Sequence, residues 1–373
     1  MRINLRWISV GFALAMMAFI AFYYPLEITQ SANRLVVAGT DSAAATVRFG
    51  VIGDFGLAGA AEASVTTLVK GWQPDFIVTV GDNNYYSGSA ATIDQNIGQY
   101  YHDYIYPYLG MFGPDAPSQT NRFFPTLGNH DWELLTCKGG TCTGAYFDYF
   151  TLPNNERYYD FVQGPVHFFL LDSDAREPDG ITSTSAQATW LRDKLAAAQE
   201  PWKLVFLHHS PYSSVPDDGA TPKVRWPYAQ WGATAVLSGH THNYERVMRD
   251  GFAYFINGVG GVPIDGFGTP VTGSTVRYDG AHGAMLVAAS ESTLTLQFVN
   301  VANSVIDTYS LAAEPPAATP TNTPTLPVTT TPPAATLTNT PTPPVTDTPT
   351  SVATQIATPS ETPGLYYFPQ IIR

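Results

Sequence analysis

The chain has 373 residues, with 31 acidic and 18 basic side chains and a formal net charge of -13. Such an acidic chain argues against nucleic acid as a partner, because that binding depends on clustered Lys and Arg side chains. Both ends are abnormal in composition, and the middle, residues 46–312, is long enough for one α/β domain with a buried core.

Residues 1–33 predict a signal peptide or a signal anchor. Arg2 and Arg6 form a short basic region, and residues 7–26 are almost wholly apolar and carry no charge. A signal-peptide core has about 7–15 apolar residues, and a membrane-spanning helix needs about 20, so cleavage stays open. We expect an exported protein, either secreted or held at the cell surface.

Apolar runs and helical patterns alternate through the middle of the chain. The expected strands are residues 46–52, 76–80, 166–171, 203–207, 234–237, 284–288 and 294–299. The expected helices are residues 58–72 and 187–199. Several strands end directly at a motif with polar side chains, which is where α/β sheets place their ligand sites.

The two cysteines, Cys137 and Cys142, flank a Gly-Gly pair that lets the loop turn back. In an exported protein they predict a small disulfide, since two thiols are too few for a closed metal site. Residues 313–363 are rich in Pro and Thr and predict a disordered, semi-rigid stalk. Residues 364–373 form a short apolar tail, which is either a surface-attachment signal or an adhesive end without a role.

Five motifs in order along the chain carry side chains that can bind metal ions. They are Gly53-Asp54-Phe55-Gly56, Gly81-Asp82-Asn83-Asn84-Tyr85, Gly128-Asn129-His130-Asp131, His208-His209-Ser210-Pro211 and Gly239-His240-Thr241-His242. A carboxylate can bridge two cations, and imidazole suits iron, zinc and similar ions. The phenol of Tyr85 is the most informative member, because a highly charged ion such as ferric iron is needed to remove its proton at neutral pH. The set predicts a dinuclear metal centre for hydrolysis of phosphate esters.

The order and spacing of these motifs resemble those of the calcineurin-like metallophosphoesterases. Tyr85, three residues after Asp82, is similar to the pattern of the purple acid phosphatases, and the single-domain, tartrate-resistant form is the closer match. The resemblance covers about residues 46 to 300. It implies a four-layer α/β/β/α sandwich and acid phosphatase activity on small phosphate esters, with a metal-bound hydroxide as the nucleophile.

The resemblance also implies roles for single residues. It implies that Asp54, Tyr85 and His242 bind Fe(III) and that Asp82 bridges the two ions. The second ion is Fe(II), Zn or Mn, and its implied ligands are Asn129, His209 and His240. His130, beside Asn129 at the substrate, is the expected proton donor to the leaving group.

The adjacent histidines 208 and 209 point to opposite faces if they lie in a strand. We choose His209 as the ligand because Ser210-Pro211 follows it as in the family, which leaves His208 a structural or rim position. His102, His167 and His282 are expected outside the centre. Arg246 contacts either phosphate or a structural acidic partner.

Two alternatives remain open. One is a phosphodiesterase or nucleotidase of the same superfamily that uses Mn or Zn. The other is a non-catalytic binding module displayed at the surface, which the complete set of ligand side chains disfavours. Attachment to a membrane or cell surface through either end of the chain also stays open.

Overall fold

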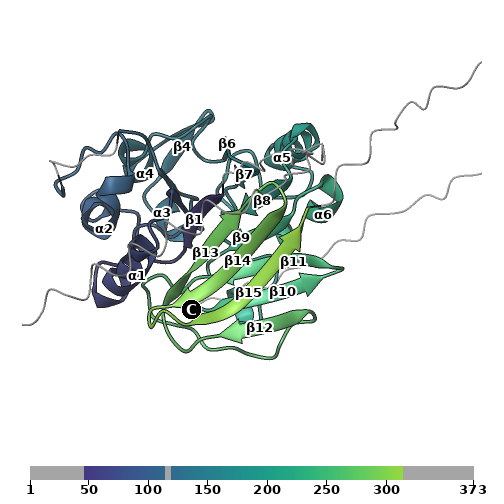
Figure 1. Ribbon diagram of the computed structural model, residues 1–373. Helices are drawn as coiled ribbons and strands as arrows, with labels where there is room; N and C mark the ends of the chain where they lie inside the picture. The colour runs from purple at the N-terminus through teal and green to yellow at the C-terminus, as the bar shows by residue number, and fades with distance from the viewer. Residues whose placement is uncertain (1–45, 114–118, 314–373) are drawn as a thin grey trace, which may run out of the picture. The chain divides into compact units, whose positions relative to one another are not determined.

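The computed structural model describes residues 46–113 and 119–313 (Figure 1). The predicted leader, stalk and tail lie outside these residues, apart from residue 313, and the domain limits stay predictions. None of the helices in the described ranges is long and apolar enough to cross a membrane.

Two sheets form the centre of the domain. The first sheet has the strand order β15 (Val305–Ala312), β14 (Thr293–Asn300), β13 (Gly283–Ala289), β1 (Val47–Ile52), β2 (Phe76–Thr79) and β3 (Phe123–Phe124). The second has the order β12 (Ser274–Tyr278), β10 (Tyr244–Arg249), β11 (Phe252–Asn257), β9 (Ala235–Ser238), β8 (Trp202–Phe206), β7 (Val166–Leu170) and β6 (Tyr159–Gln163).

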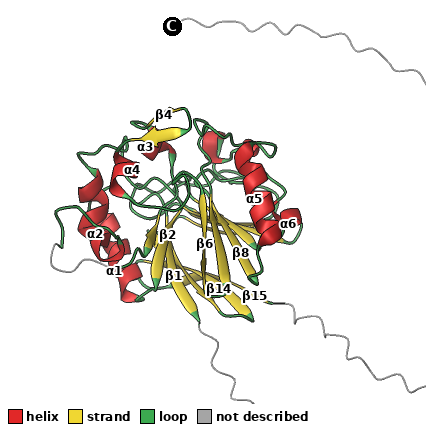
Figure 2. Cartoon of the chain, turned by 90° about the horizontal axis from the view of Figure 1, so that it is seen from above, coloured by secondary structure: helices red, strands yellow, loops and turns green. Residues whose placement is uncertain are grey.

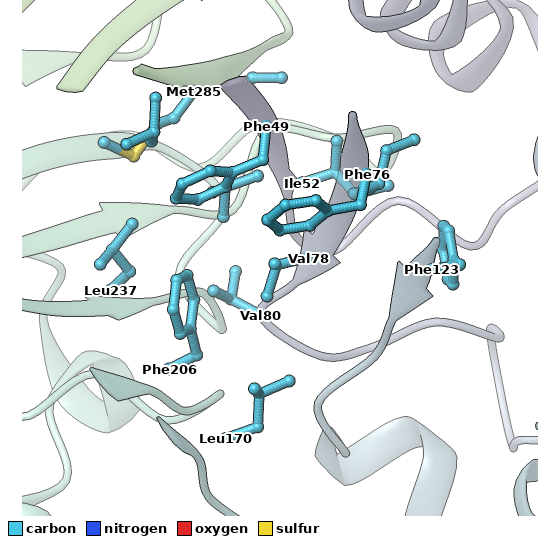
Figure 3. Packing of buried hydrophobic residues seen from close by; sticks show 14 of the residues in the cluster. Phe49, Ile52, Phe76, Val78, Val80, Phe123, Leu170, Phe206, Leu237 and Met285 are labelled. Atoms are coloured by element: carbon cyan, nitrogen blue, oxygen red, sulfur yellow. The ribbon is translucent and has the colours of Figure 1, made fainter. Parts of the chain in front are cut away.

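Aromatic side chains from both sheets fill the space between them (Figure 3). The ring of Phe49 on β1 stacks on that of Phe76 on β2, with centroids 5.1 Å apart. It also meets the edge of Phe168 on β7 at 5.0 Å, which joins the two sheets. Phe168 in turn packs on Phe206 of β8. This core holds the inner faces of the sheets together.

Helices cover the outer faces (Figure 2). The helices are α1 (Ala60–Gly71), α2 (Gln99–Tyr101), α3 (Asn129–Trp132), α4 (Ala145–Tyr149), α5 (Ala186–Ala197) and α6 (Tyr228–Trp231). Helix α1 packs near the first sheet and buries Val65 and Val69 at helical spacing. Helix α5 packs against the second sheet through Leu191 and Leu195. The four-layer fold expected from the sequence is therefore confirmed.

The central strands run parallel: β1 with β2 and β3, and β7 with β8, β9 and β11. Parallel strands bring their carboxyl ends to one edge, so the loops that follow β1, β2, β8 and β9 start close together. All the strands and helices expected from the sequence are present with small shifts at their ends. Strands β6, β10, β11, β12 and β15 were not predicted.

A short hairpin of β4 (Thr136–Lys138) and β5 (Thr141–Thr143) follows α3. Cys137 and Cys142 form a disulfide across it, as expected. The guanidinium of Arg157 donates to the carbonyl oxygen of Gly140 at 2.8 Å and pairs with buried Glu177. These contacts fix the hairpin to the domain.

Candidate metal centre

Two buried carboxylates form the middle of the site. Asp54 follows β1 and Asp82 follows β2, and their side chains are essentially inaccessible to water. Both residues have φ near 54°, in the left-handed region, which a non-glycine residue adopts only when its surroundings hold it there. Backbone amides fix the two groups, because His240 N–H donates to Asp54 and His130 N–H donates to Asp82.

Glycines let the neighbouring loops approach these carboxylates. A Cβ on Gly128 would lie 2.2 Å from Oδ1 of Asp82, and one on Gly239 would lie 2.4 Å from Oδ2 of Asp54. No side chain fits at either position. The loops that carry Asn129 and His240 therefore reach the carboxylates only because glycine precedes each.

Tyr85 lies between the two carboxylates on one side of the site. Its hydroxyl is 2.8 Å from Oδ2 of Asp82 and 3.3 Å from Oδ1 of Asp54. Nε2 of His242 lies 3.5 Å from the same hydroxyl and 3.7 Å from Oδ1 of Asp54. Asp54, Tyr85 and His242 thus present three donor atoms to one small volume.

Asn129, His208 and His240 meet on the other side of the site. Oδ1 of Asn129 is 3.0 Å from Nε2 of His208 and 3.0 Å from Nδ1 of His240. Nε2 of His208 is also 3.3 Å from Oδ2 of Asp82. Asp82 therefore lies between the two groups of donor atoms.

The structure reverses the sequence-based choice between the two adjacent histidines. Ligand atoms of Asp54, Asp82 and His208 all lie within 4.8 Å of one another. His209 instead points away from the carboxylates, and its Nδ1 lies 2.9 Å from the hydroxyl of Ser173. His208 is thus the residue that faces the carboxylates, and His209 packs beside the site.

Alternation along β8 explains the reversal. Leu204 and Phe206 face the core between the sheets, whereas Val205 and Leu207 face the helices. His208 continues the inward set, toward the loops after β1 and β2. This signal was present in the sequence, but its use required knowing which face of the strand is turned to the other sheet.

The electrostatics of the site call for a cation. Burial raises the pKa of Asp54 well above its usual value, and the neighbouring charge of Asp82 adds to the rise. Burial of His208 would lower its pKa, but Asp82 and Asp54 outweigh this and raise the pKa to about 10. Burial followed by the two aspartates also raises the pKa of Tyr85. Two buried carboxylates, a phenol, an amide oxygen and imidazoles form a donor set that fits metal ions of the iron, zinc and manganese type.

His130 lies at the open side of the site. Its Nδ1 donates to the carbonyl oxygen of Tyr86 at 2.6 Å, so Nε2 is the nitrogen turned toward Asp82, at 4.0 Å from Oδ2. The ring packs on Tyr85 with centroids 4.3 Å apart, and about a third of the side chain is exposed. His130 can therefore contact a molecule bound at the centre.

Asp131 supports the centre from behind, a role that was not predicted from the sequence. Its carboxylate accepts hydrogen bonds from the backbone N–H groups of Asn83 and Gly128 and from the Asn83 side chain. It thereby joins the Asp82 loop to the Asn129 loop. Burial, followed by the nearby Asp82 charge, raises the pKa of Asp131 to about 7.

The remaining candidates lie elsewhere. His102 and His282 bind backbone carbonyl oxygens, and His167 pairs with Asp160 and Glu200, so none of the three reaches the centre. Arg246 pairs with Asp307 and not with the site.

Comparison with known proteins places this geometry in a family. The family model of calcineurin-like phosphoesterases matches residues 47–244, more than half of the chain. The chain belongs to the calcineurin-like phosphoesterase family. The resemblance inferred from the five motifs is confirmed.

The similar curated proteins include purple acid phosphatases. Human tartrate-resistant acid phosphatase type 5 is 25% identical over 253 residues, covering 59% of this chain and 74% of the human protein. Purple acid phosphatase 23 of Arabidopsis thaliana is 24% identical over 235 residues, covering 54% of this chain and 48% of that protein.

Two solved structures share the fold. A purple acid phosphatase from yellow lupin seeds has a TM-score of 0.58 at 18% identity, covering 72% of this chain and 54% of the lupin chain. This chain thus spans about half the length of each of the two plant proteins. GAP50, described as the anchor in the inner membrane complex of Plasmodium, has a TM-score of 0.55 at 17% identity, covering 72% and 90%. At these identities the likeness shows the fold alone.

Proposed function

We propose that this chain is a metal-dependent phosphoric monoester hydrolase of the acid phosphatase type. The proposed cofactor is a dinuclear centre of Fe(III) with Fe(II), Zn or Mn. When bound, the ions would activate water as the nucleophile and offset the negative charge of the phosphate. The matched relatives, several of which are named acid phosphatases, support the class of reaction.

The position of Tyr85 carries the proposal. Its hydroxyl lies between two buried carboxylates, at 2.8 and 3.3 Å, and these charges raise the pKa of the phenol after burial has already done so. A phenolate at this place therefore needs a strongly charged cation beside it. A trivalent ion meets that need better than a divalent one.

The geometry divides the donor atoms into two groups. Asp54, Tyr85 and His242 would hold the ferric ion. Asn129, His208 and His240 would hold the second ion, with His208 in place of the His209 expected from the sequence. Asp82, between the groups, is the proposed bridging ligand.

His130 is the proposed proton donor to the leaving oxygen. Because Nδ1 donates to the carbonyl of Tyr86, the ring orientation is fixed and Nε2 is presented to the centre. Nε2 can hold a proton there when the ring is an imidazolium. The substrate would be a small phosphate ester, and we infer no nucleic-acid partner from a net charge of -13.

We also propose that the protein is exported, secreted or held at the cell surface. The Cys137–Cys142 disulfide supports this, since disulfides persist in oxidising compartments. The predicted leader supports it as well, although it lies outside the described residues.

The test combines a spectrum with turnover of the full chain. A tyrosinate bound to ferric iron absorbs visible light, so the purified protein should be coloured and should hydrolyse 4-nitrophenyl phosphate. Tyr85→Phe should lose the absorption band, whereas Tyr86→Phe, which alters the exposed neighbouring ring, should keep it. A colourless Mn or Zn protein that prefers bis(4-nitrophenyl) phosphate would favour the phosphodiesterase alternative. A chain that binds no metal under any loading condition would favour a non-catalytic module.

A further inference from the structure

A cavity of about 310 Å³ opens beside the metal centre on the His209 side. His209 and Ser173 are among its lining residues, and the ring of His209 packs on His240, with centroids 4.5 Å apart. The His209 ring is also 5.1 Å from the ring of His208. The cavity is therefore separated from the candidate metal ligands by a single imidazole ring.

Ser173 fixes the His209 imidazole, which lies between the cavity and the centre. The backbone N–H of His209 donates to the Ser173 hydroxyl at 2.8 Å, and the same hydroxyl lies 2.9 Å from Nδ1 of the ring. Having accepted the first hydrogen bond, the Ser173 O–H can donate a hydrogen bond to Nδ1 of His209. The ring is thus held on both its backbone and its side chain, as the wall of a binding site requires.

The other walls of the cavity are mostly apolar. Ile181 is buried, and Ala220, Pro222 and the exposed Ala175 add apolar surface, with Thr221 as a further polar residue of the lining. Apolar walls with a few polar groups are typical of sites that hold the organic part of a small ligand. A volume of this size is at the lower end for such sites, so it suits a compact group.

Lys223 contributes a positive charge to the lining. Its side chain is exposed and makes no ion pair and no side-chain hydrogen bond with any residue that the structure describes. Arg176 near the site differs, because its guanidinium is already bound to Asp174, Glu133 and the Asn129 carbonyl. In a chain with a net charge of -13, an unpaired lysine in the lining of the cavity is available to an anionic ligand.

We propose that this cavity binds the organic group of the phosphate ester and selects compact groups with an apolar body and an acidic substituent. The inference rests on the proposed phosphatase function. The phosphate would lie at the metal centre, the apolar body would lie against Ile181 and Ala220, and the acidic substituent would pair with Lys223. Lys223 and Ala220 are thus specificity-determining residues.

The role of the Lys223 charge in substrate selection is tested with two esters of nearly the same shape, 4-carboxyphenyl phosphate and 4-carbamoylphenyl phosphate. For the full, metal-loaded chain we expect a higher kcat/KM with the carboxylate ester. Lys223→Gln should lower the ratio of the two kcat/KM values about twofold to fivefold, the range of one exposed ion pair. The matched control is Lys203→Gln, which removes a charge at the amino end of β8, away from the site, and should leave the ratio unchanged. An unchanged ratio in Lys223→Gln would overturn the role of the charge.

The role of the cavity in holding the organic group of the ester is tested by filling it with Ala220→Phe. We expect kcat/KM for both aryl esters to fall at least tenfold, while kcat/KM for acetyl phosphate, which is too short to fill the cavity, changes less than twofold. Equal losses for all three substrates, or no loss for any, would place the organic group elsewhere, for example beside the exposed ring of Tyr86. These results differ from failure of the proposed function, in which the metal-loaded wild-type chain would hydrolyse none of the three.

Discussion

Glu62 makes the stability of this fold dependent on pH. Its side chain is fully buried in the first turn of α1, and neither carboxyl oxygen has a hydrogen-bond partner among the described residues. Burial raises the pKa of Glu62 well above its usual 4.5. The titratable groups near it are the phenols of Tyr100 and Tyr101, which offer no positive charge.

The sign of the effect follows from proton binding. Below pH 4.5 the carboxyl is protonated in both the folded and the unfolded chain, so its titration does not lower the free energy of unfolding there. Above that pH the unfolded chain releases the proton while the folded chain keeps it, and the free energy of unfolding falls. The slope reaches about 1.4 kcal/mol per pH unit and ends once pH exceeds the folded pKa.

Glu62→Gln removes this dependence, because glutamine has a similar shape and does not titrate. The buried amide lacks partners and costs about 1–3 kcal/mol at every pH. This cost lowers the free energy of unfolding by the same amount at each pH and does not change its slope against pH. Urea denaturation between pH 4 and pH 7 should therefore show that the free energy of unfolding of the variant rises relative to that of the wild type as pH rises. Glu291→Gln, at an exposed turn, should not alter the slope. Parallel curves for wild type and Glu62→Gln would refute the reasoning.

Three further predictions concern the hairpin, the link between the sheets and the approach of the loops. Replacing Cys137 and Cys142 together by serine should lower the free energy of unfolding by about 2 kcal/mol, measured by urea denaturation without reductant, and an unchanged midpoint would contradict this. Asp307→Ala should cost about 3 kcal/mol in the same assay, because it leaves a guanidinium and a phenol of β10 unpaired between the sheets. A loss under 0.5 kcal/mol would mean that this link contributes little. Gly128→Ala should weaken metal binding at least tenfold in a chelator competition, since its Cβ would meet the Asp82 carboxylate, and normal affinity would show that the loop can shift.

Strands β1, β2 and β9 were predictable because each is a short apolar run that leads to a glycine at the start of a polar motif. Phe76–Thr79 is buried at every position, and the sequence 76–80 shows this without any tertiary information. Two of the unpredicted strands differ, since β12 alternates between partly buried and exposed positions and β15 is mostly exposed or partly exposed. Their pairing depends on β10 and β14, which are neighbours only in the folded chain.

The donor set of the site was predictable to a greater extent than its geometry. Asp54, Asp82, Tyr85 and His242 were chosen from motif chemistry, and the structure brings them together. His209 was chosen because Ser210-Pro211 follows it, but the alternation of β8 turns His208 toward the carboxylates instead. The ligand roles of all these residues stay predictions.

The proposed function depends on two neighbouring cations held by loops from distant parts of the chain. Anomalous X-ray diffraction from crystals of the metal-loaded protein, recorded at the iron, zinc and manganese edges, tests it directly. We predict two peaks about 3.5–4 Å apart on either side of the Asp82 carboxylate. One should lie next to Tyr85 and show the iron edge, and the other should lie next to His208 and Asn129. A single peak, or peaks that lie away from Asp82, would contradict the claim.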